Sequence, residues 1–182
     1  MAKLSFFTEE DIEAIISLPY RVGMHVSYAE DEDGEQDDER EMRALRACLA
    51  EIARVHEGQE LTKEIAAATL NAEDKWEAWS QGVFNIEPLC EKAVVALKTQ
   101  AGQEEVKDFI KMTINVATSV AQAYGEFGDA SEPEKGFFGK VMGGIVKTVS
   151  SLSADDASHP MNVSAAEDSA ISNIAFALKK AA

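Results

Sequence analysis

The chain is organised around one acidic stretch, Glu30-Asp31-Glu32-Asp33-Gly34-Glu35-Gln36-Asp37-Asp38-Glu39-Arg40-Glu41. Nine of its twelve residues are acids, and only Arg40 opposes them. Segments with apolar residues at helical spacing lie on both sides, at residues 12–28 and 42–55. We therefore expect the stretch to form a bend between two helices.

Two interpretations of this acidic bend are open. Like-charge runs are usually solvated turns. Carboxylates held close together also repel one another until a hard cation or a basic partner neutralises them. Asp31, Asp33 and Gly34 have the spacing of the middle of an EF-hand loop, but Arg40 then stands where the bidentate glutamate belongs. A cation site here must be of another kind, with Glu30 or Asp31 ending one helix and Asp38 or Glu39 starting the next.

Composition predicts one all-α domain spanning residues 1–182. Hydrophobic residues make up 46% of the chain, which is ordinary for a folded protein. The formal net charge of −16 disfavours nucleic acid and anionic membranes as partners, and favours cations or basic proteins. No apolar run is long enough to span a bilayer, and no secretory signal is visible, so we expect a cytoplasmic location. Cys48 and Cys90 lie in apolar helical patterns and are expected to be buried thiols.

The periodicity is helical throughout and predicts a compact bundle of seven or eight helices. Thr8 is a candidate N-cap of the first helix, which Pro19 should kink or restart. The second helix should start at Asp37, and Trp76 and Trp79 should pack in the core. Residues 127–160 differ, because they are rich in Gly, Ser, Asp and Pro. They predict an inserted loop with a helix at 135–152.

A weak internal repeat relates the two halves of the chain. A shift of 94 residues pairs identical residues: Ile16 with Ile110, Val22 with Val116, Val26 with Val120, Ala29 with Ala123 and Gly34 with Gly128. Each copy has an apolar helix, a polar bend and a capped helix. In the second copy the bend is expanded, and the capped helix starts with the capping box Ser164-Ala165-Ala166-Glu167. The pattern predicts two pseudo-symmetric helix–bend–helix units.

At these residues the chain resembles the TerB-like proteins of tellurite resistance. The end of the first helix, near Glu30 and Asp31, and the acidic opening Asp37-Asp38-Glu39-Arg40 are similar to the family pattern. The second copy departs from it, since Tyr124 stands where an aspartate is expected. The resemblance covers roughly residues 12–57 and 104–180, and it implies an all-helical fold that binds Ca²⁺ through acids at the bends.

The predicted metal ligands combine both bends: Glu30, Asp31, Asp33, Asp38 and Glu39 at the first, and Glu126 and Glu167 at the second. Oxygen ligands favour Ca²⁺, with Mg²⁺ or Mn²⁺ as alternatives. Glu167 also has a sufficient structural role in its capping box. The helix at 135–152 has two further interpretations besides closing over the core: it can pack on a protein partner or adsorb to a membrane surface.

Catalysis finds little support, because His25, His56 and His159 stand in no metal or catalytic motif and no phosphate-binding glycine motif is present. We expect His25 to pair with a carboxylate. The sequence therefore predicts a non-enzymatic, divalent-cation-binding helical domain in a metal- or stress-response assembly. The alternative is an acidic protein–protein interaction module that holds no fixed ion.

Overall fold

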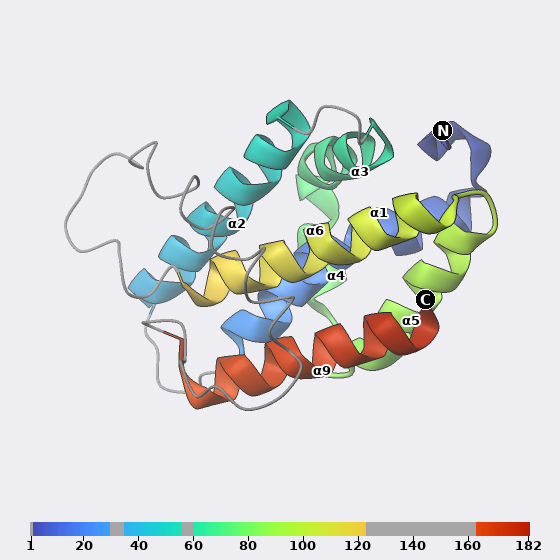
Figure 1. Ribbon diagram of the computed structural model, residues 1–182. Helices are drawn as coiled ribbons and strands as arrows, with labels where there is room; N and C mark the ends of the chain where they lie inside the picture. The colour runs from blue at the N-terminus through green and yellow to red at the C-terminus, as the bar shows by residue number, and fades with distance from the viewer. Residues whose placement is uncertain (1, 30–34, 56–59, 123–162) are drawn as a thin grey trace.

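The computed structural model describes residues 2–29, 35–55, 60–122 and 163–182, and in these ranges it is a compact bundle of seven α-helices without a strand (Figure 1). The α-helices are α1 (Glu9–Ser27), α2 (Glu35–Val55), α3 (Glu60–Asn71), α4 (Trp76–Ser80), α5 (Ile86–Lys98), α6 (Gln103–Ala121) and α9 (Ala165–Ala181). Short 3-10 helices, η1 (Leu4–Phe6) and η2 (Glu73–Lys75), precede α1 and α4. The all-helical prediction is confirmed. The predicted insertion at 127–160, including its helix, lies outside the described residues.

Helix α1 begins as its sequence predicts. The Thr8 hydroxyl oxygen accepts a hydrogen bond from the Asp11 backbone N–H at 3.2 Å, and acids fill the first turn, where the helix dipole favours them. Pro19 was expected to kink or restart the helix; it does not restart it, since α1 continues through Pro19 to Ser27. Pro19 lies on the buried face, so packing against neighbouring helices holds the turn despite the missing N–H. Helix α2 begins two residues earlier than predicted, at Glu35.

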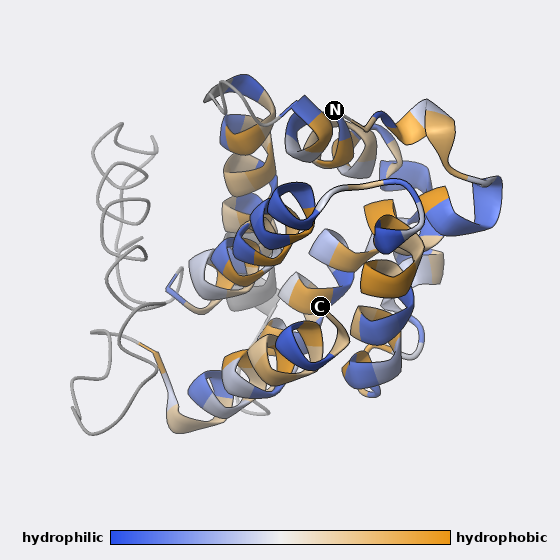
Figure 2. Cartoon of the chain, turned by 45° about the vertical axis from the view of Figure 1, so that its right-hand side comes forward, coloured by the Kyte–Doolittle hydropathy of each residue, from blue (hydrophilic) through white to orange (hydrophobic). Residues whose placement is uncertain are grey.

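Helices α1 and α6 form the centre of the bundle, and α2 and α9 lie on opposite sides of this pair (Figure 1). Both central helices are 19 residues long, and the 94-residue shift found in the sequence superposes their bounds. The same shift matches their buried faces, for example Ile15 with Phe109 and Val22 with Val116. The amphipathic stripe of each helix buries its apolar side against its neighbours, as the hydropathy colours show (Figure 2).

The middle of the chain packs against α1. Trp76 and Trp79 are buried, as predicted, and the Tyr20 ring stacks on Trp76 with 4.7 Å between ring centroids. Gly23 allows α2 and α6 to approach α1 closely: a Cβ on Gly23 would lie 2.9 Å from Leu45 Cδ1. Cys48 and Cys90 are buried and unbridged, and burial raises the pKa of the Cys48 thiol to about 11. None of the described helices is long and apolar enough to cross a membrane.

Candidate functional site

The structure describes only part of the predicted metal site. Glu30, Asp31, Asp33 and Glu126 lie outside the described residues. Asp38 and Glu39 belong to the first half of α2, but their side chains are also outside the described part of the chain. Glu167, in the first turn of α9, is the predicted ligand whose surroundings are described. Across the described residues, no three side chains of His, Cys, Asp or Glu come together as a metal-binding group.

Glu167 is a buried capping residue. Its side chain is 1% exposed, and its Oε2 accepts a hydrogen bond from the Ser164 backbone N–H at 2.8 Å. In return, the Glu167 backbone N–H donates to Ser164 Oγ at 3.2 Å. The two hydrogen bonds satisfy two backbone N–H donors that have no partner within the helix. The capping box predicted from the sequence is therefore confirmed.

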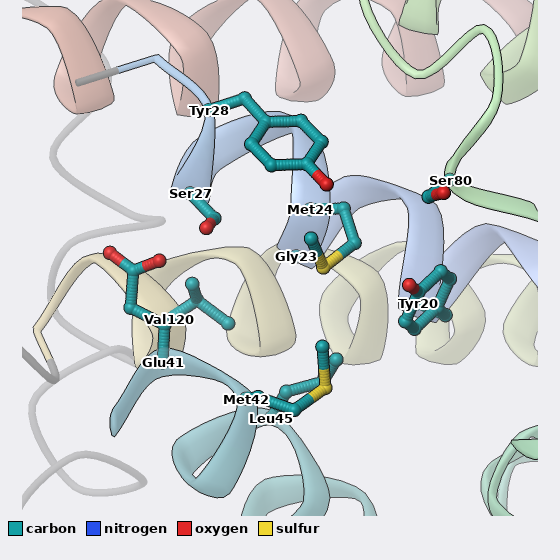
Figure 3. A pocket seen from close by; sticks show the side chains of 10 residues that line it. All are labelled: Tyr20, Gly23, Met24, Ser27, Tyr28, Glu41, Met42, Leu45, Ser80 and Val120. Carbon is teal, nitrogen blue, oxygen red and sulfur yellow. The ribbon is translucent and has the colours of Figure 1, made fainter. Parts of the chain in front are cut away.

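A second buried glutamate, Glu41, lies near the start of α2 and was not among the predicted ligands. Glu41 is 5% exposed and lines a cavity of about 250 Å³ between α1, α2 and α6. The lining residues are Tyr20, Gly23, Met24, Ser27, Tyr28, Glu41, Met42, Leu45, Ser80 and Val120. Figure 3 shows the Glu41 carboxylate on the same side as the Ser27 hydroxyl, at the end of α1 where the acidic bend begins.

Glu41 and Glu167 each begin the same spacing of buried residues on their helices. From Glu41, buried residues of α2 follow at 44, 48 and 52; from Glu167, buried residues of α9 follow at 170, 174 and 178, with the same spacing. The sequence carries a signal for this match, because Asp38 precedes Glu41 by three residues, as Ser164 precedes Glu167. This spacing does not stand out in the sequence, because many other acids surround Glu41.

Tyr28, one of the lining residues, belongs to an exposed aromatic pair. Tyr28 is 42% exposed and stacks on Phe84, which is 76% exposed, with 5.7 Å between ring centroids. The loop that bears Phe84 is fixed to α1, because His25 Nδ1 donates a hydrogen bond to the Val83 carbonyl oxygen at 2.9 Å. Val83 is fully buried, which brings this carbonyl against α1. The Nδ1 partner of His25 is therefore a backbone oxygen and not the expected carboxylate.

The polar groups of the cavity are one carboxylate and several hydroxyls. Burial raises the pKa of Tyr20 to about 12, so its phenol is neutral at physiological pH. The apolar part of the cavity wall consists of Met24, Met42, Leu45 and Val120. Such a site can bind a cation through oxygen ligands at its acidic end or enclose a small apolar group beside them.

Comparison with protein-family models, curated proteins and solved structures found no match to this chain.

Proposed function

We propose that the chain is a non-enzymatic, divalent-cation-binding helical domain of the TerB-like, tellurite-resistance type, acting in a metal- or stress-response assembly. The ion of choice is Ca²⁺, with Mg²⁺ or Mn²⁺ as alternatives. The first bend, between α1 and α2, is the principal site. On this proposal the finer architecture is that of two pseudo-symmetric helix–bend–helix units.

The observation that carries the proposal is the position of Glu41, a carboxylate that is 5% exposed, lies in the first turns of α2 and lines the cavity at the end of α1. At the first bend, Glu41 lies within a few residues of the acids at 30–39, which bring the oxygen atoms that a hard cation needs. The net charge of −16 adds a general attraction for cations.

A melting experiment with paired variants tests this function. Wild-type protein should gain stability with millimolar Ca²⁺ or Mn²⁺, because an ion that binds only the folded state shifts unfolding to higher temperature. At a concentration one hundred times Kd, the gain is about 2.7 kcal/mol. For a chain of this size that corresponds to a rise in Tm of about 5–10 °C.

The variants locate the ion. Asp31→Asn combined with Glu39→Gln should abolish the ion-dependent rise in Tm and the heat measured by titration calorimetry. Glu32→Gln combined with Glu35→Gln removes the same charge from the same stretch and should leave most of the rise intact. Absence of both heat and Tm shift in the wild-type protein at millimolar ion rules the function out.

A second candidate function, docking of a basic protein, is favoured by the exposed Tyr28–Phe84 pair beside the acidic bend. Exposed aromatic residues next to charge are common at protein interfaces. This candidate predicts no ion-dependent stabilisation, so the same melting experiment separates the two functions.

A further inference from the structure

We propose that the cavity between α1, α2 and α6 binds a small organic cation, an ammonium group carried on a compact apolar body. This inference does not depend on the divalent-ion site at the bend, although both are close to Glu41. It rests on the shape, lining and charge of the cavity.

The charge of the cavity is located at one end. Among the ten described residues that line it, Glu41 carries the only formal charge. The Ser27 hydroxyl lies at the same end of the cavity as the Glu41 carboxylate, whereas Tyr20 and Ser80 lie at the other end (Figure 3). The carboxylate and the hydroxyl oxygen beside it can both accept hydrogen bonds from an ammonium group.

The body of the cavity is apolar. Figure 3 shows Met24 of α1 and Met42 of α2 extending toward one another across the space, with the Tyr28 ring beside them. Methionine side chains adapt to irregular apolar ligands, and aromatic faces attract cations. An anion would meet the Glu41 carboxylate without a cationic partner among the described lining residues.

The size of the cavity limits the ligand. Its volume of about 250 Å³ is just below the range of about 300–1,000 Å³ that is typical of drug-sized pockets. A simple alkylamine or arylamine fits this volume. A lysine side chain of a peptide presents the same chemistry.

An NMR titration tests the proposal. Benzylamine, protonated at pH 7, is added to ¹⁵N-labelled protein, and the amide shifts of Ser27, Tyr28 and Ser80 are followed. Ser27 ends α1, Tyr28 directly follows it and Ser80 ends α4, so coordinated shifts at both places report binding in the cavity. Benzyl alcohol is the matched neutral probe and should bind at least tenfold more weakly. A second titration uses Nα-acetyl-lysine methylamide, which represents the lysine side chain of a peptide. Whichever of the two amines has the lower Kd shows whether the ammonium group comes from a small amine or from a peptide lysine.

Four variants make the test decisive. Glu41→Gln should weaken benzylamine binding at least tenfold, whereas Glu104→Gln, which removes an exposed carboxylate of the same charge, should not. Ser27→Leu narrows the cavity while it keeps Glu41, and it should also reduce binding at least tenfold. Amide dispersion verifies that each variant is folded. The double variant Asp31→Asn, Glu39→Gln should still bind the amine, which separates this site from the divalent-ion site. Equal binding of benzylamine and benzyl alcohol, or binding unchanged in both Glu41→Gln and Ser27→Leu, overturns the proposal.

Discussion

The helix pairs α1–α2 and α6–α9 share a pattern of burial but use one matched residue differently. Helices α1 and α6 have the same length, and the buried positions of α2 and α9 have the same spacing. Each second helix carries a buried glutamate at the start of that spacing. In α9 this glutamate caps its own helix, whereas in α2 it lines a cavity.

The difference follows from where each helix begins. Helix α9 starts at Ala165, so Glu167 is its third residue and reaches the N-cap backbone N–H. Helix α2 starts at Glu35, which places Glu41 more than one turn inside the helix. Glu41 is therefore not at the third helical position, from which a capping-box glutamate reaches back to the N-cap. The same buried position therefore closes a helix end in one pair and supplies a carboxylate to a cavity in the other.

The largest expected effect tests whether α2 and α9 are equivalent in the core. Ile52 and Leu178 hold matched positions and are 1% and 0% exposed. Ile52→Ala and Leu178→Ala should each lower the free energy of unfolding by about 2–5 kcal/mol, through lost burial and the cavity left behind. Urea denaturation measures both. Phe176→Ala, at an exposed position of α9, should stay within about 0.5 kcal/mol of wild type. A small loss at only one of the two core positions would contradict the equivalence.

A smaller effect separates the two glutamates by role. Glu167→Ala should cost about 1–3 kcal/mol, because the Ser164 backbone N–H loses its acceptor in a half-buried place. Ser164→Ala should cost about 1 kcal/mol, and the double variant should cost less than the two together, since both belong to one capping box. Urea denaturation of the three variants measures the coupling.

The control for this capping effect is Asp38→Ala, which changes the α2 residue that matches Ser164. Because α2 has already begun at Glu35, Asp38 is no N-cap, and the variant should stay within about 0.5 kcal/mol of wild type. A loss at Asp38 as large as at Ser164 would show that α2 is capped in the same way as α9.

The sequence could predict those features of the fold that depend on neighbouring residues. Thr8 and Asp11, or Ser164 and Glu167, are three residues apart, so their caps are readable without a structure. The 94-residue shift also related α6 to α1, because the same spacing of apolar residues gives the two helices matching buried faces. Burial of Trp76 and Trp79 followed from their size and apolar surface.

The cavity could not be predicted, because it depends on contacts between distant segments. Glu41 is one of nine acids in twelve residues, and only the packing of α1 and α6 against α2 selects it for burial. The close approach at Gly23 and the hydrogen bond from His25 to Val83 join residues far apart in the chain. Spacing along the sequence carries no signal for such contacts.

The smallest expected effect concerns a contact that α1 makes and α6, among the described residues, does not. Glu13 of α1 accepts hydrogen bonds from Trp79 Nε1 and from Lys75 Nζ, whereas Lys107, its counterpart on α6 in the 94-residue register, pairs with Glu104 of its own helix. Burial alone would raise the pKa of Glu13, but the hydrogen bonds from Lys75 and Trp79 lower it below its usual value.

A lowered carboxyl pKa means that the folded state holds the ionised form better than the unfolded chain does. The stability from Glu13 is therefore present above the unfolded pKa of about 4.3 and is lost as pH falls through the lower folded value. Wild-type protein should lose stability between about pH 5 and pH 3 more steeply than Glu13→Gln, as measured by urea denaturation across this range. Glu104→Gln should reduce this acid-induced loss of stability less than Glu13→Gln does. Its partner Lys107 lies on the same helix, and both side chains are largely exposed, so solvent screens the pair. If both variants reduced the acid-induced loss of stability equally, the contacts of Glu13 between α1 and α4 would stabilise the fold no more than the ion pair within α6 does.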